Sequence, residues 1–300
     1  MIKKIIAAEG YSEVVTWSFM DGNKAKLLFD NLISLQNPIS SDLNTMRPST
    51  IPNLLEGINQ NKARMYTRAK IFEVGPNFSK SLSDFQENVA SAITYGSIDE
   101  ENWLSNKKNT NVYNLKADLF SVLTILNVPI NNLLYDKNED NIYHPGKSAT
   151  LRLGKNIIAK FGELHPILLK TMDINIKVYG FEIYLDNISQ FQENKSFSRD
   201  SFLNNPYQMV ERDFAFLFPK EIEANEIIKK VKKIDKNIIN KVTIFDVYEG
   251  DKLPDNNKKS IAIRVLLQPQ DKTFKDEDIE NLSKEIIDQI SKSFAASIRK

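Results

Sequence analysis

The chain has 300 residues, of which 41% are hydrophobic and 26% are charged, a composition typical of a globular protein with one large or two smaller domains. Forty Lys and Arg against 39 Asp and Glu give a net charge of +1, so any nucleic-acid binding must come from local patches. The absence of Cys excludes disulfides, thiolate metal sites and a cysteine nucleophile. No apolar run approaches the roughly 18 residues of a membrane span, and we expect a cytoplasmic protein without membrane contact.

Residues 1–200 predict a mixed α+β domain with a mostly antiparallel sheet. Helical spacing of apolar residues predicts helices at 2–8, from Pro52 onward, and over 115–126 before Pro129. Strands are predicted at 14–19, 70–74, 149–153, 157–161 and 178–185. The polar segment 186–206, rich in Asn and Ser and closed by Pro206, predicts a linker.

Residues 207–300 predict a second domain with the element order β-α-β-β-α-β. The strands are expected at 214–218, 241–248, 260–267 and 295–298, and the helices at 224–234 and 279–294. Thr273 and Asp276 have the spacing of a capping box in front of the second helix. This order is the split βαβ or ferredoxin-like plan, which serves RNA recognition and many other functions.

Two side chains near the end of the third predicted element suggest a nucleotide contact. Asp246 and Tyr248 are two residues apart in a strand and should lie on one face, just before a Gly250-Asp251 turn. A carboxylate beside an aromatic ring can hold one unpaired base, although the pair can equally cap a core and start a turn. Nearby lysines form either a phosphate-binding patch or a solvated helix face: Lys229, Lys230, Lys232, Lys233, Lys236 and Lys241.

Common catalytic motifs are missing. Residues 144–148 (HPGKS) end like a phosphate loop, but Asn141 stands where that loop needs glycine. His144 and His165 lie 21 residues apart, each before a proline, which fits local backbone contacts and neither a metal site nor a catalytic triad. We therefore expect no metal site and no catalytic residue in this chain.

Short motifs along the whole chain point to a family. They are residues 10–14 (GYSEV), 37–55, 70–78 (KIFEVGPNF), 162–166 (GELHP), 212–216 (RDFAF), 245–250 (FDVYEG), 259–260 and 273–276. In this order they resemble the beta chain of bacterial phenylalanyl-tRNA synthetase. The resemblance implies a class II synthetase catalytic-like domain over 1–200, without catalytic activity, and a ferredoxin-like anticodon-binding domain over 207–300.

The residues agree with a lost catalytic site. A working class II core places an arginine inside an F-R-x-E strand, whereas here Phe72 is followed directly by Glu73. The later strand 179–186 carries no arginine, and Arg47 is expected to pair with a carboxylate at a subunit contact. The resemblance implies a non-catalytic part of phenylalanine–tRNA ligase that docks the catalytic alpha chain in a heterotetramer of two alpha and two beta chains. ATP and magnesium are then expected only in the holoenzyme.

For RNA, the resemblance implies binding of the tRNA-Phe anticodon, with its first base stacked on a strand tyrosine. The matching positions are Asp246, Tyr248 and Ser260, and Lys229, Lys232, Lys233 and Lys236 are candidate phosphate contacts. The family's beta chain is longer at its N-terminus, so the editing site, an OB-like fold and the ligands for a shared magnesium are expected before residue 1 and editing is expected to be absent here. Two alternatives stay open: an autonomous class II ligase that binds ATP, and a general RNA- or protein-binding module without a synthetase partner.

Overall fold

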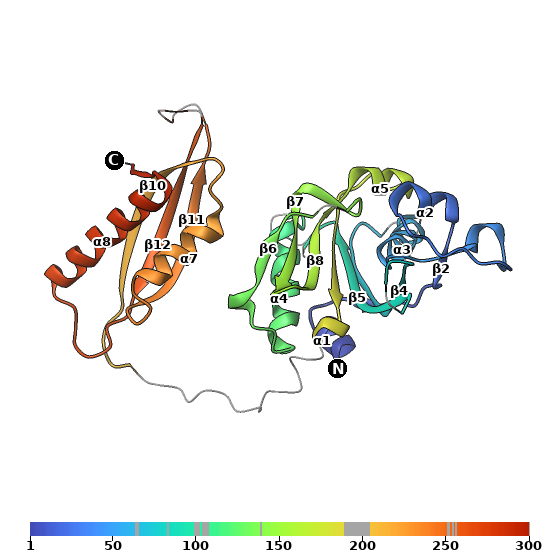
Figure 1. Ribbon diagram of the computed structural model, residues 1–300, viewed down its shortest axis with the longest axis horizontal. Coiled ribbons are helices and arrows are strands. Elements are labelled where there is room, and N and C mark those ends of the chain that lie inside the picture. Colours follow the sequence, from blue (N-terminus) through green and yellow to red (C-terminus); the bar gives the residue numbers. More distant parts are fainter. Residues whose placement is uncertain are drawn as a thin grey trace. The chain divides into compact units, whose positions relative to one another are not determined.

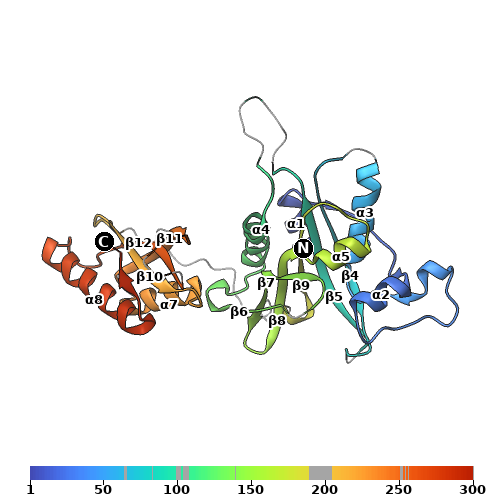
Figure 2. The ribbon, with the colours of Figure 1, turned by 90° about the horizontal axis from the view of Figure 1, so that it is seen from above.

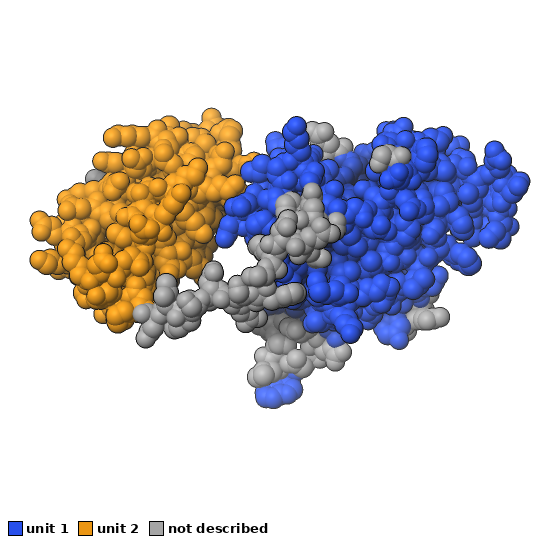
Figure 3. Space-filling model, turned by 60° about the horizontal axis from the view of Figure 1, so that its bottom comes forward, with its two compact units in different colours: residues 1–197 blue, residues 198–300 orange. Residues whose placement is uncertain are grey.

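The computed structural model describes residues 1–63, 66–82, 84–98, 103, 108–138, 140–188, 205–250, 253, 255 and 257–299. The chain divides into two compact units, Met1–Phe197 (unit 1) and Ser198–Lys300 (unit 2), which are coloured separately in Figure 3. Most of the predicted linker, residues 189–204, lies outside the described residues.

Unit 1 is built on a seven-stranded sheet with the strand order β1-β4-β5-β9-β8-β7-β6 (Figure 1). Its strands are β1 (Ser12–Glu13), β4 (Ala69–Phe78), β5 (Gln86–Tyr95), β6 (Leu134–Asp136), β7 (Tyr143–Leu153), β8 (Asn156–Leu164) and β9 (Val178–Tyr184). All neighbours pair antiparallel except β1 and β4, which are parallel. The predicted mixed α+β architecture with a mostly antiparallel sheet is therefore confirmed.

Helices cover both faces of this sheet. On one face, α1 (Ile2–Ala8) and α4 (Val112–Ile125) pack in one hydrophobic core, and on the other α3 (Ile51–Ala63) and α5 (Pro166–Thr171) pack in a second. Helix α4 begins where the Asn111 side chain accepts from the Tyr113 and Asn114 N–H groups. Smaller elements complete the unit: β2 (Phe19–Met20), α2 (Gly22–Leu28), β3 (Thr45–Met46) and the 3₁₀ turns Ser41–Leu43 and Ile130–Asn132.

The predicted strand at 14–19 is wrong. Only Phe19 joins a strand, the short β2, and residues 14–18 have no ladder of their own. Two of their backbone groups bond to buried side chains: the Thr16 N–H donates to the Glu73 carboxylate (3.1 Å), and the Trp17 carbonyl accepts from Asn53 (2.9 Å). Alternating hydrophobicity cannot reveal such partners, because they come from distant parts of the chain.

Strand β5 was not predicted from the sequence. Seven of its ten positions, from Val89 to Tyr95, are buried on both faces of the sheet. A strand covered on both sides has no alternation of polar and apolar residues, and periodicity then fails to detect it.

Unit 2 is a four-stranded antiparallel sheet with the order β11-β12-β10-β13. Its elements are β10 (Val210–Pro219), α7 (Ala224–Ile234), β11 (Ile239–Tyr248), β12 (Lys258–Leu267), α8 (Asp276–Phe294) and β13 (Ser297–Ile298). The predicted β-α-β-β-α-β order is confirmed, and so is the ferredoxin-like plan.

Both helices of unit 2 cover one face of the sheet (Figure 2). Ile227 and Val231 of α7 and Ile286 and Ile290 of α8 enter one core with Phe214, Phe216 and Phe218 of β10. Among the described residues of unit 2, no helix covers the opposite face, which we call the open face. The predicted cap at Thr273 is wrong: α8 begins at Asp276, after Lys275, whose N–H donates to the Asp278 carboxylate (3.1 Å).

Candidate nucleic-acid interface

The open face of unit 2 carries the carboxylate and the phenol predicted from the sequence. Directly paired residues on neighbouring strands share a face, and Asp246 pairs with Ala262 while Tyr248 pairs with Ser260. On β12 these positions alternate with Ile261 and Ile263, which point into the core. Asp246, Tyr248 and Ser260 therefore lie on the same, helix-free side of two adjacent strands.

Arg299 joins this group, although the sequence did not point to it. Its Nη1 donates to Ser260 Oγ (3.2 Å), and its guanidinium carbon lies 5.6 Å from the centre of the Tyr248 ring. Its backbone N–H donates to the Ala215 carbonyl (2.8 Å), which holds the residue beside β10. Ser260 itself is only 3% exposed, and its hydroxyl accepts the hydrogen bond from the exposed Arg299 side chain. Residues 297–298 pair with β10, and knowledge of this pairing would have placed Arg299, the next residue, at the edge of the sheet.

Gly250 lies against the Tyr248 ring. A Cβ built at Gly250 would lie 2.9 Å from the Tyr248 hydroxyl oxygen, so a larger residue here would displace the end of the ring. The predicted turn follows at once, since the Leu253 N–H donates to the Gly250 carbonyl (3.1 Å). The other residue of the predicted turn signal, Asp251, lies outside the described residues.

Most of the lysine patch lies on the other side of unit 2. Helix α7 turns Ile227 and Val231 into the core of the helix-covered face, so Lys229, Lys230, Lys232 and Lys233 belong to a helix on the side opposite Tyr248, and Lys236 follows that helix. Lys241 differs: it belongs to β11 and pairs with Leu266, which alternates with core residues of β12, so it lies on the open face. Lys232, Lys233 and Lys236 are exposed, Lys229 and Lys230 are half-buried, and none of the five forms an ion pair with a described residue. The lysines of α7 therefore lie away from Tyr248.

Arg47 is buried in unit 1, and this differs from the expected subunit contact. Its side chain is 1% exposed, and its Nη1 lies 2.8 Å from Oε1 of Glu73 in the same chain. The same guanidinium donates to Thr16 Oγ1 (2.9 Å) and to the Pro76 carbonyl (3.1 Å). The expected pairing with a carboxylate exists, but it holds the interior of unit 1 together and leaves no guanidinium surface for another subunit.

A row of polar side chains crosses the sheet of unit 1 in direct register. From β4 to β6 the row consists of Glu73, Ser91, Glu182, Lys160, Thr150 and Asp136. Sequence reasoning missed it because these residues come from six strands whose order was unknown. Glu182 is the most enclosed member: it is 1% exposed and accepts from Ser49 (2.8 Å) and Asn77 (3.3 Å).

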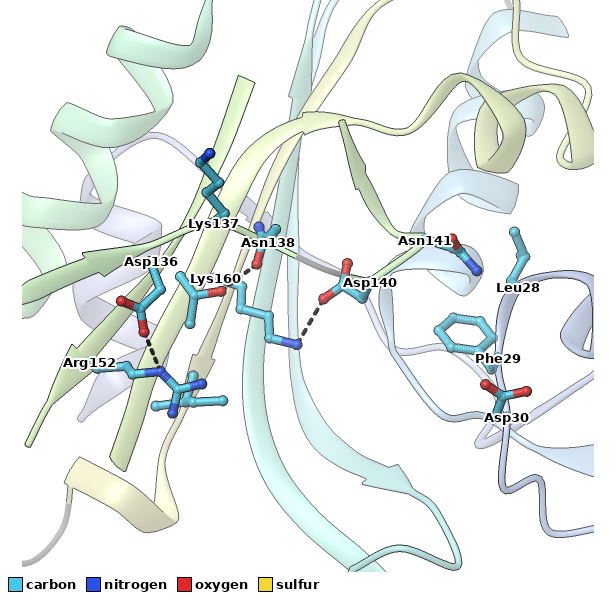
Figure 4. Close-up of a pocket in the computed structure, with 12 residues that line it drawn as sticks. Leu28, Phe29, Asp30, Asp136, Lys137, Asn138, Asp140, Asn141, Arg152 and Lys160 are labelled. Carbon is cyan, nitrogen blue, oxygen red and sulfur yellow. Dashed lines mark hydrogen bonds and ion pairs between the residues drawn. The ribbon is translucent and has the colours of Figure 1, made fainter. Parts of the chain in front are cut away.

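One end of this row opens into a cavity of about 610 Å³. Figure 4 shows two of the lining cations directed at carboxylates: Lys160 Nζ lies 2.8 Å from Asp140, and Arg152 Nε lies 2.6 Å from Asp136, while the third cation, Lys137, is drawn without such a contact. A cation that is already paired offers less to a phosphate, because a new anion must compete with the resident carboxylate. Among the described residues that line the cavity, the one arginine, Arg152, is thus already paired with a carboxylate.

Two carboxyl groups have a raised pKa: Glu87 near the polar row and Glu182 within it. The pKa of Glu87 is raised to about 7 by burial and by the charge of Glu182, with a further increase from Asp186 that Lys160 opposes. Burial also raises the pKa of Glu182. Between pH 4.5 and about 7 the folded chain thus keeps a proton on Glu87 that the unfolded chain has lost, and stability falls as pH rises.

Glu87→Gln should remove this part of the pH dependence. We expect the variant to melt at a higher temperature than the wild type above pH 7, because no carboxylate has to ionise in a partly buried site. Below pH 4.5 the two proteins should melt alike, since Glu87 is then protonated in both the folded and unfolded states. Melting temperatures measured from pH 4 to 8 test this, and a difference that does not change with pH would contradict it.

The described residues hold no group of three or more His, Asp or Glu placed to bind a metal ion. In the same part of the chain, no helix combines the length and the apolar character that crossing a membrane requires.

Comparisons with known proteins agree with these features. Residues 1–185 match the family described as "Phenylalanyl tRNA synthetase beta chain CLM domain", and residues 205–299 match "Ferredoxin-fold anticodon binding domain". The phenylalanine–tRNA ligase beta subunit of Rhodospirillum rubrum is 37% identical over 300 residues, which is 99% of this chain and 37% of the relative. That of Rickettsia bellii is 38% identical, over 99% of this chain and 34% of the relative.

The chain thus spans about a third of the length of these curated relatives. Among solved structures, a pyrrolysyl tRNA synthetase of Desulfitobacterium hafniense has a similar fold, with a TM-score of 0.50, 16% identity and 64% of each chain covered. That likeness concerns the fold alone. Because the first family match covers more than half of the residues, this chain belongs to the phenylalanyl-tRNA synthetase beta chain family.

Proposed function

We propose that this chain is a non-catalytic part of phenylalanine–tRNA ligase that docks the catalytic alpha chain and binds the anticodon of tRNA-Phe. Residues 1–200 form the docking domain and residues 207–300 the anticodon-binding domain. The observation that carries the proposal is the convergence of Asp246, Tyr248 and Arg299 on the open face of a unit that matches an anticodon-binding family.

The open face suits one unpaired base. The Tyr248 ring stacks under the base, and the Asp246 carboxylate accepts hydrogen bonds from donors on the base edge. Arg299 holds the ring from one side, and Ser260 positions Arg299. Because β11 holds the backbone of Asp246 and Tyr248, little backbone freedom is lost when the base binds.

Unit 1 is proposed to be a class II synthetase-like domain without its own chemistry. Three observations support this: the polar row on an antiparallel sheet, the paired cations of the cavity, and the burial of Arg47 against Glu73. The fold likeness to a synthetase agrees with it. ATP and magnesium then belong to the holoenzyme of two alpha and two beta chains in the cytoplasm, and the ligase reaction takes place on the alpha chain.

The lysine patch has a separate role in this proposal. Lys229, Lys232, Lys233 and Lys236 lie away from the open face and would contact phosphates of another part of the tRNA. Such contacts add affinity without reading a base, and their contribution decreases as salt is raised.

Tyr248→Ala tests the anticodon assignment. We expect the variant, in complex with the alpha chain, to bind tRNA-Phe more weakly by about 1–3 kcal/mol, or roughly 5- to 150-fold, because one base loses its stacking partner. Tyr248→Phe should bind nearly as well as the wild type, since it keeps the ring. Val247→Ala is the matched control, because Val247 is 53% exposed on the same strand.

The measurement is equilibrium binding at one fixed salt concentration, with an unrelated tRNA as competitor. Unchanged affinity for Tyr248→Ala would remove the anticodon assignment. Equal affinity of the wild type for both tRNAs would favour the alternative of a general RNA-binding module.

A further inference from the structure

A β-bulge brings a second aromatic side chain onto the open face. In β11, Ile244 pairs with Ile263 and Asp246 pairs with Ala262, so Phe245 is the extra residue between two consecutive pairs. A bulge redirects the side chains around it, which a regular strand would send to alternate faces. Phe245 is 52% exposed, and the guanidinium carbon of Arg264 lies 5.2 Å from its ring centre.

Arg264 places the Phe245 ring on the open face and holds it there. Position 264 alternates with Ile263 and Val265, which point into the core, so Arg264 projects from the open face. Its Nε and Nη2 donate to the two carboxylate oxygens of Asp213 on β10 (2.8 and 2.7 Å). A guanidinium held at two points is a rigid neighbour for the ring.

The charge around Phe245 favours a base over a phosphate. Asp213 holds the guanidinium in a bidentate pair, and Glu211 lies 3.6 Å from the same group. A phosphate would have to displace these carboxylates, whereas a base can stack on the exposed half of the ring without breaking any of these contacts. The oriented ring therefore offers a flat, apolar surface whose binding energy comes from stacking.

We propose that Phe245 and Arg264 form a second stacking platform, which binds the unpaired base adjacent to the one on Tyr248. The inference rests on the proposed function, because it extends the same RNA site along β11. Phe245 and Tyr248 are three residues apart, roughly 10 Å along a strand, too far for two bases that stay stacked on each other. The spacing fits bases that are splayed apart, each on its own aromatic side chain with Asp246 between them.

The test combines a protein variant with an altered RNA. The probes are tRNA-Phe anticodon stem–loops, either intact or with an abasic nucleotide at one of the three anticodon positions. We expect Phe245→Ala to weaken binding of the intact stem–loop at least tenfold, which is about 1.4 kcal/mol. On one of the abasic stem–loops, Phe245→Ala should bind as well as the wild type, because the base that Phe245 would bind is already missing. In the same way, one abasic position should cancel the loss caused by Tyr248→Ala. We expect these two positions to be adjacent in the anticodon.

Phe245→Trp should bind as well as the wild type, because it keeps an aromatic surface. Unfolding temperatures of all variants should match that of Val247→Ala, since half of the Phe245 side chain is already exposed. A loss for Tyr248→Ala with none for Phe245→Ala would overturn the second platform and leave the proposed function standing. No loss for either variant would overturn both the second platform and the proposed function. An equal loss for Phe245→Ala on every abasic RNA would overturn the second platform, because Phe245 would then affect the fold and not one base.

Discussion

Replacing Arg47 with Met is expected to lower the free energy of unfolding of unit 1 by about 3–5 kcal/mol. The variant would leave the Glu73 carboxylate, whose side chain is 6% exposed, without its cation in the interior. The Thr16 hydroxyl and the Pro76 carbonyl would each also lose a hydrogen-bond donor. An unpaired buried charge costs far more than a surface ion pair contributes, so the effect should be large.

A double variant separates the charge from the packing. Arg47→Met combined with Glu73→Leu removes both charges and should recover part of the loss, because no uncompensated ion remains. Recovery should be incomplete, since Thr16 donates to Glu73 through both its N–H and its hydroxyl. Lys24→Met is the matched control: its partner Glu56 is 3.8 Å away and both side chains are exposed, so we expect a change of about 0–1 kcal/mol.

Urea unfolding of the three variants measures these differences. If the single and double variants lose the same stability, the buried charge is not the source of the effect.

Replacing Phe216 with Ala is expected to cost about 3–5 kcal/mol, and the loss should be confined to unit 2. Phe216 is fully buried at the centre of an aromatic row, with its ring centre 6.2 Å from that of Phe214 and 5.7 Å from that of Phe218. The cavity would lie beside Ile261 of β12, the residue that follows Ser260. We therefore expect tRNA binding to fall together with the folded fraction of unit 2.

Hydrogen exchange resolved by peptide measures this loss unit by unit. Peptides from β10 to β12 should lose protection in Phe216→Ala, while peptides from β4, β5 and β9 should keep it, because the two units have separate cores. Phe216→Leu should cost less, since it leaves a smaller cavity. Equal loss of protection in both units would contradict independent folding.

Strand periodicity predicts only some of the side chains that lie on the open face of unit 2. The i, i+2 rule placed Asp246 and Tyr248 together, and pairing with β12 brought Ser260 beside them. The rule also assigns Phe245 to the opposite face, and there it fails, because a bulge is a property of two paired strands and not of one. Arg299 was missed for a similar reason, since its place beside Tyr248 depends on how β13 pairs with β10.

In unit 1 as well, local periodicity predicted some elements, whereas strand pairing decided which polar side chains meet. Helical spacing predicted α4, which buries one face in a single core, and apolar runs predicted β8 and β9, which are buried along most of their length. Residues 14–18 alternate like a strand, but Glu73 and Asn53 take up two of their backbone groups. The polar row of Glu73, Ser91 and Glu182 has no local signature, since its members are neighbours only through strand pairing.

The sequence by itself determined the element order of unit 2, several helices and strands of unit 1, the family, and the pair Asp246 and Tyr248 on one face of a strand. These depend on local periodicity and short motifs, which neighbouring residues carry. Only the tertiary structure decided that Arg47 is an interior ion-pair partner, that the lysines of α7 lie away from the open face, and that Phe245 and Arg299 lie on the open face, where we propose that bases bind. The physical reason is that a buried charge, a shared face and a bulge all depend on strands that meet far apart in the chain, and no local pattern specifies which strands will meet.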